Sequence, residues 1–177
     1  MTLRMKIDKL KSVKHFSLFI GLLLSLSSCG VYSFSPSKLD SNLKTFSIQN
    51  FTMSTAGGPQ NLSLSFNEKL KEYYQRNTSL KFKNLDGDLH LEGTIVGYEL
   101  TPVSATAGDK AAMNRLTITV EVRLVNKIDE SKNFERDFSF FQDFSQEQSL
   151  SQAEPALVPK ILDQLVLNIF TATAADW

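Results

Sequence analysis

This 177-residue sequence has few of the residues that build common catalytic and metal centres. It contains one cysteine and two histidines, His15 and His90. An intrachain disulfide needs a second cysteine, and a zinc site or a histidine-containing triad draws on several such side chains. The sequence also has no G-x-S-x-G motif, P-loop or paired-glycine fingerprint. We therefore expect no catalytic residue, no metal site and no dissociable cofactor, and we expect His90 to be a solvated strand residue.

The single cysteine, Cys29, follows a segment with the layout of a secretory signal peptide. Residues 1–15 carry five basic side chains and one acid, and residues 16–26 are an apolar run. This run is too short to cross a bilayer, which takes about 20 helical residues. Leu26-Ser27-Ser28-Cys29 resembles a bacterial lipobox, in which the cysteine thiol receives a diacylglyceryl group and the new amino terminus is acylated. Cys29 is thus the predicted lipidation site, whereas Met1 and Met5 both remain possible starts.

The residues after Cys29 indicate where the anchored protein resides. In enteric bacteria, an aspartate directly after the lipidated cysteine resembles an inner-membrane retention signal, but this sequence has Gly30 at that position. Residues 31–34 contain no acidic residue, so they do not resemble the acidic surface-export tag of some lipoproteins. We expect the inner leaflet of an outer membrane, with a tether over residues 29–44 and one domain over residues 45–177 in the periplasm. Without residues 1–28 the chain has 14 basic (19 − 5) and 18 acidic (19 − 1) residues. This mildly acidic balance gives no reason to expect nucleic acid binding.

The spacing of apolar residues predicts an α+β fold. Residues 45–51, 88–100, 114–126 and 133–144 alternate as strands, and residues 52–60 read as a loop. Gly93 and Gly97 indicate a bulge or bend in the second of these strands. Residues 61–77 have an amphipathic helical pattern with Asn61 as a possible N-cap. We expect two amphipathic helices on one face of a four-stranded, mostly antiparallel sheet, in the order β-α-β-β-β-α.

The second helix carries two signals near its start. Ser151 and Glu154 match a capping box, so we expect the helix to begin there and to run to about residue 174. Pro159 lacks the N–H group that an inner helical turn needs, so we expect it to kink the helix or to delay its regular part.

Two basic pairs are candidate ligand-binding residues. Lys81 and Lys83 alternate with apolar residues after the first helix, and Lys110 and Arg115 flank the connection before the strand at 114–126. Such side chains are either solvated charge at loop ends or phosphate contacts, with arginine able to bind bidentately. The acids of the Asp86-Gly-Asp motif fall short of a calcium loop and favour a turn.

Several stretches resemble the LptE family of lipopolysaccharide-assembly lipoproteins in its Bacteroidetes form. They are CGVYSF at 29–34, GDLHLEGTIVGY at 87–98, AAMNRLTITVEVRLVNK at 111–127, FQDFSQEQSLS at 141–151 and the terminal Trp177. The resemblance implies a non-enzymatic protein with two helices on a four-stranded sheet. It also implies a place inside the large β-barrel LptD, where such proteins plug the barrel, assist its assembly and bind lipopolysaccharide.

The residues leave other functions open beside this resemblance. A contact of Lys110 or Arg115 with lipid A phosphates is a hypothesis from charge and loop position alone. A generic lipid-anchored binding or chaperone module, for lipid or for outer-membrane protein, fits the same anchor and fold. A periplasmic hydrolase is disfavoured because a nucleophile and a base are not paired in the sequence.

Overall fold

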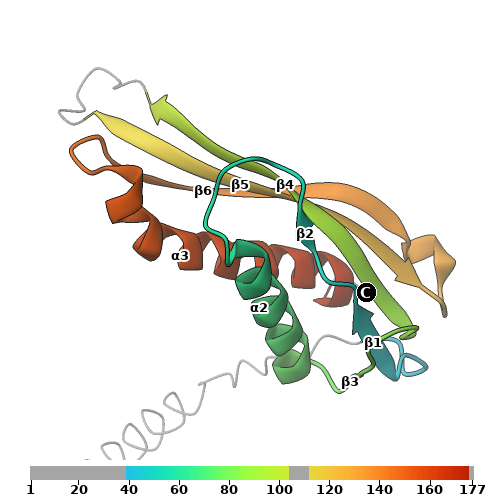
Figure 1. Ribbon diagram of the computed structural model, residues 1–177. Helices are drawn as coiled ribbons and strands as arrows, with labels where there is room; N and C mark the ends of the chain where they lie inside the picture. Colours follow the sequence, from blue (N-terminus) through green and yellow to red (C-terminus); the bar gives the residue numbers. More distant parts are fainter. Residues whose placement is uncertain (1–38, 104–111, 176–177) are drawn as a thin grey trace, which may run out of the picture. The chain divides into compact units, whose positions relative to one another are not determined.

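The computed structural model describes residues 39–103 and 112–175, which form a mixed sheet with two helices (Figure 1). The strands are β1 (Thr45–Ile48), β2 (Thr52–Met53), β3 (Lys81–Phe82), β4 (Leu89–Val103), β5 (Met113–Asn126) and β6 (Phe134–Ser145). The helices are α2 (Leu62–Asn77) and α3 (Leu150–Phe170), with a 3-10 turn η1 (Glu130–Lys132) and a final π-helical turn η2 (Thr171–Ala175).

Strands β4, β5 and β6 form the predicted antiparallel meander. Every second residue of β5 from Leu116 to Leu124 is buried, because these side chains point toward the helices. The pairing of β4 with β5 shifts register between Ile95 and Gly97, which confirms the bulge expected from the glycines. Phe134, Phe138 and Phe140 of β6 all belong to or pack against the core, as their shared parity predicts.

The start of the chain corrects the predicted topology. The sheet has six strands in the order β3-β1-β4-β5-β6, with β2 also paired to β4, so neither four strands nor the order β-α-β-β-β-α holds. Strand β1 runs parallel to both β3 and β4, because α2 returns the chain to the same end of the sheet. The two-residue strands β2 and β3 are too short to show an alternating pattern in the sequence.

The connection from β3 to β4 passes directly against β1. Asp86 has a positive φ of 62°, and a Cβ on Gly87 would meet the Ser47 nitrogen at 2.5 Å and the Phe46 carbonyl carbon at 2.6 Å. A glycine is therefore required at this crossing, since only its bare backbone fits against the strand.

Both helices cover the same face of the sheet (Figure 1). Helix α2 buries Leu62, Phe66, Leu70 and Tyr74, which recur every fourth residue along one face. Its predicted N-cap, Asn61, is at the right position but makes no side-chain capping hydrogen bond.

Helix α3 begins earlier than predicted. Its capping box joins Ser149 and Gln152, in place of Ser151 and Glu154, so the first helical residue is Leu150. Pro155 and Pro159 both lie within a helix that continues to Phe170, so Pro159 does not delay its regular part.

Helix α3 together with η2 is long and apolar enough to span a membrane by length and composition, over Leu150–Ala174. Half of its most apolar window is buried within the fold. Its apolar side, including Leu157, Ile161 and Leu165, packs into the single core cluster, as expected of the core helix of a globular domain.

Candidate functional site

The face of the sheet without helices is mostly polar, with apolar side chains at its ends, namely Val125 at one and Val103 and Met113 at the other. It is formed by the side chains that alternate with the buried ones along the three long strands, and the strand registers align them in rows. Its members are His90, Glu92, Thr94, Glu99 and Thr101 of β4, Arg115, Thr117, Thr119, Glu121 and Arg123 of β5, and Glu135, Asp137, Ser139, Phe141 and Asp143 of β6. We call this set the polar sheet face.

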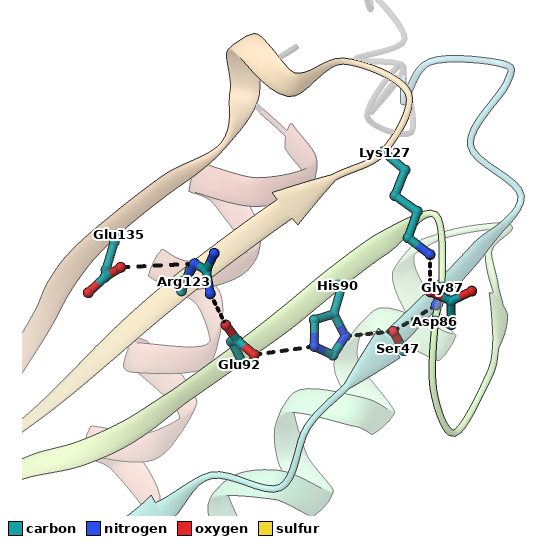
Figure 2. A network of polar contacts seen from close by, with 8 residues as sticks. All are labelled: Ser47, Asp86, Gly87, His90, Glu92, Arg123, Lys127 and Glu135. Carbon is teal, nitrogen blue, oxygen red and sulfur yellow. Dashed lines mark hydrogen bonds and ion pairs between the residues drawn. The ribbon is translucent and has the colours of Figure 1, made fainter.

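Cross-strand contacts satisfy many of the polar groups on this face. Arg123 of β5 contacts an acid on each neighbouring strand (Figure 2). Its Nη1 donates to Glu92 Oε1 at 2.6 Å, and its Nε lies 4.0 Å from Glu135 Oε2. Near the middle of the face, the Thr119 hydroxyl hydrogen-bonds Ser139 Oγ at 3.1 Å. Such pairs directly opposite one another each stabilise a sheet by about 0.2–1 kcal/mol.

A Ser-His-Glu arrangement occurs at one end of the face. Ser47 Oγ lies 2.8 Å from His90 Nδ1, and His90 Nε2 lies 3.6 Å from Glu92 Oε2 (Figure 2). Ser47 is completely buried, and its Oγ also accepts the Gly87 N–H at 2.9 Å. A substrate has no access to this hydroxyl, so the arrangement joins β1 to β4 and is structural. His90 is consequently half-buried and partnered, not simply solvated as the sequence suggested.

Arg115 lies at the opposite end of the face, where β5 begins. Its Nε and Nη2 donate to the two carboxylate oxygens of Asp143 at 2.7 and 2.9 Å, and its guanidinium lies 3.6 Å above the Phe141 ring. The hydrogen bonds from Arg115 lower the pKa of Asp143, and the same pairing raises the pKa of Arg115. The Asp143 pair therefore engages Nε and Nη2 of Arg115 and fixes the orientation of its guanidinium.

Lys81 and Lys83 lie far from Arg115. Both are exposed at the sheet edge formed by β3, where Thr45 pairs with Lys81. Strand β1 joins β4 at Leu89, whereas Arg115 pairs with Thr101, so the length of β4 separates the two basic features. The structure does not bring them into one site. Lys110 and Cys29 lie outside the described residues.

The Asp86-Gly-Asp motif is a structural turn. Asp88 Oδ2 accepts the Lys44 and Thr45 N–H groups at 3.0 and 2.9 Å, and Asp86 pairs with Lys127. Within residues 39–103 and 112–175, no group of three or more histidine, cysteine, aspartate or glutamate side chains is arranged to hold a metal ion.

The sequence analysis missed the partners of the charged residues. Alternation along residues 114–126 places Arg115 and Arg123 outward, but Asp143, Phe141, Glu92 and Glu135 become their neighbours only through the register of β4 and β6. The sequence gives one signal for such pairs, namely that the outward positions of the predicted strand at 114–126 include arginines while those of the strands before and after it include acids.

Comparisons with known proteins identify the family. The model of the LptE family, described as lipopolysaccharide-assembly, matches residues 43–173. No curated protein sequence matches this chain at a significant level.

Several solved structures of lipoproteins are similar to this chain at low identity. A minor lipoprotein from Acinetobacter baumannii is 16% identical, with a TM-score of 0.45 over 72% of this chain and 89% of that one. The rare lipoprotein B from Shewanella oneidensis is 12% identical, with a TM-score of 0.48 over 73% and 90% of the two chains. An uncharacterized lipoprotein B from Nitrosomonas europaea is 14% identical, with a TM-score of 0.48 over 72% and 79%.

The family assignment rests on the family model, which spans the domain from just before β1 to within η2. Its members are non-enzymatic envelope lipoproteins. The chain belongs to the LptE family of lipopolysaccharide-assembly lipoproteins.

Proposed function

We propose that this protein is anchored through lipid on Cys29 in the inner leaflet of the outer membrane, where it plugs an LptD-like β-barrel. In that position it helps to assemble the barrel and assists lipopolysaccharide transport to the outer leaflet. The family assignment supports the lipopolysaccharide-assembly role, and the lipobox-like Leu26-Ser27-Ser28-Cys29 supports the anchor.

The observation that carries the plug proposal is the polar sheet face. Wide transmembrane barrels have polar interiors, so a plug must present polar groups to the wall. On this face the guanidinium of Arg115 is paired with Asp143, and that of Arg123 with Glu92 and Glu135. Both arginine charges therefore stay compensated by carboxylates when the barrel wall displaces bulk water. The hydroxyls of Thr117, Thr119 and Ser139 lie between the two arginine sites and offer hydrogen bonds to a wall.

The phosphate contact of Lys110 and Arg115 remains part of the proposal. Arg115 binds Asp143 through Nε and Nη2, so a lipid A phosphate would use the outer Nη1 edge while the Asp143 pair fixes the orientation of the guanidinium. Alanine at both positions lowers lipopolysaccharide binding by the purified complex if this assignment holds. Unchanged binding would refute it.

Extraction in mild detergent tests the plug directly. We expect the tagged protein to co-purify with one very large β-barrel and with lipopolysaccharide in the eluate. Ser139→Trp places a bulky side chain in the exposed middle of the polar sheet face and is expected to weaken co-purification. Lys160→Trp, at an exposed position on α3, is the matched control. Recovery without any barrel would favour the generic lipid-anchored binding or chaperone module.

A further inference from the structure

The two most exposed large apolar side chains among the described residues are Leu85, in the connection from β3 to β4, and Leu64, near the start of α2. Leu85 is 76% exposed and Leu64 is 61% exposed. Both line one open groove of about 600 Å³ that runs between α2 and the edge of β1 and β3. The groove floor includes Ile48 and Phe82, so the exposed leucines continue an apolar surface.

Three lysines lie beside this apolar surface, one in the groove lining and two at strand β3. Lys81 and Lys83 are exposed on either side of Phe82, and neither lies within 4 Å of an acidic group in the described part of the chain. Lys71 Nζ lies 4.0 Å from the centre of the Phe82 ring. Glu68 lines the groove together with Lys71, whereas Lys81 and Lys83 lie outside the groove lining. Asp86 follows Leu85 and is paired with Lys127, so the edge has three lysines against Glu68 and this paired aspartate. We call Leu64, Leu85, Lys71, Lys81 and Lys83 the edge patch.

The described chain begins beside the edge patch. The Lys81 N–H donates to the Lys44 carbonyl at 2.9 Å, and Leu39 lines a second hollow together with Ser79. Leu39 lies ten positions after Cys29 in the sequence. Even a fully extended chain spans at most about 3.6 Å per residue, so a lipid on Cys29 would hold this edge within roughly 36 Å of the bilayer surface.

We propose that the edge patch docks onto the anionic phospholipid surface of the bilayer that holds the Cys29 lipid. Leu85 and Leu64 enter the interface while Lys71, Lys81 and Lys83 face the phosphate headgroups. Apolar side chains with flanking lysines are the combination that binds at a membrane interface. This inference rests on the proposed lipid anchor, and does not depend on the proposed barrel.

The test uses the full-length lipidated protein in vesicles of phosphatidylethanolamine and phosphatidylglycerol. Because Cys29 is the only cysteine and carries lipid, Leu85→Cys gives one site for an environment-sensitive fluorophore. Leu100→Cys is the matched control, since Leu100 is 46% exposed and lies toward the opposite end of β4. We expect a blue-shifted emission and quenching by nitroxide-labelled headgroups at position 85, and neither effect at position 100.

Charge reversal then separates docking from simple proximity. Lys81→Glu with Lys83→Glu removes two attractions, each worth about fivefold in partitioning at an anionic surface, so the docked fraction falls at least tenfold and the blue shift at position 85 is lost. Lys160→Glu on α3 leaves it unchanged. Equal emission at positions 85 and 100, or a shift that survives the double charge reversal, would overturn the docking. Fluorophore uptake at Cys29 in the wild-type protein would show that the lipid is missing and overturn the anchor and the docking together.

Discussion

Gly93→Ala is the most severe small substitution that the fold offers. A Cβ at this position would lie 2.0 Å from the Glu121 carbonyl oxygen and 2.5 Å from Cε1 of Phe51. The carbonyl belongs to the middle of β5, which pairs on both sides with β4 and β6, so it cannot retreat without breaking sheet hydrogen bonds. The Phe51 ring is 1% exposed and packs against Phe66 at 5.2 Å, so it has no free space.

The magnitude follows from these contacts. Overpacking a closed site costs about 1–3 kcal/mol, and each weakened hydrogen bond adds about 1 kcal/mol. Replacing glycine in a strand returns about 0.5–1 kcal/mol of backbone entropy. We therefore expect Gly93→Ala to lower the free energy of unfolding by about 2 kcal/mol, which corresponds to roughly 4–8 °C in Tm for a domain of this size.

Gly97→Ala in the same strand is the matched control. Its Cβ would lie 3.0 Å from the Thr119 Cβ and 3.2 Å from its Oγ1, and this side chain is half-buried and can yield. We expect a change below about 1 kcal/mol. Urea unfolding of residues 36–177, a compact unit, followed by far-ultraviolet circular dichroism gives both values. If Gly93→Ala proves no less stable than Gly97→Ala, the close approach of β5 to Gly93 is wrong.

Three further substitutions test the core and its polar links. Asn67→Ala is expected to lower the free energy of unfolding in urea by about 2 kcal/mol. The reason is that the Asn67 side-chain amide accepts from the N–H of buried Phe51 at 2.8 Å and donates to its carbonyl at 2.9 Å. Asn84→Ala, at an exposed position, is the control, and equal losses in the two variants would contradict this role of Asn67. Burial raises the pKa of Tyr74, so the neutral phenol stabilises the fold below pH 10, and this stabilisation is lost as the pH rises further. In thermal melts at alkaline pH, Tyr74→Phe is therefore expected to reduce the fall of Tm with pH, whereas Tyr73→Phe, at a half-buried position, leaves that fall unchanged. The Lys44 N–H, followed by Thr45, lowers the pKa of Asp88, so its contribution is present near pH 7 and is lost as the pH falls below about 4. Asp88→Asn is therefore expected to unfold more readily than the wild type at pH 7 and to converge with it in acid; a gap that stays constant with pH would exclude this carboxylate as the cause.

The polar sheet face and the edge patch are two separate surfaces, which we propose face the barrel wall and the lipid headgroups respectively. The first is rich in charged pairs and hydroxyls and suits the polar wall of a barrel. The second combines exposed leucines with lysines and suits a lipid headgroup layer. Strand β1 and the start of β4 connect the two, so one small domain has a separate surface for each neighbour.

Much of the fold was predictable because its signals are local. Alternation along residues 114–126 gave β5 and its buried face, and the four-residue spacing of Leu62, Phe66, Leu70 and Tyr74 gave α2. The glycines indicated the β4 bulge correctly. The candidate site was harder to predict from the sequence. Charge and loop position indicated Arg115, but nothing in the sequence pairs it with Asp143, which lies 28 positions later.

The sequence by itself determined the long strands and both helices, the lipobox-like Cys29 and the family, because periodicity and motifs are properties of neighbouring residues. Only the tertiary structure decided that β1 runs parallel to β4, that Ser47 and His90 meet, and that the basic residues divide between two ends of the sheet. These features depend on how segments about 30 to 40 positions apart align. A shift of one residue in a strand's register would turn each of its side chains to the other face.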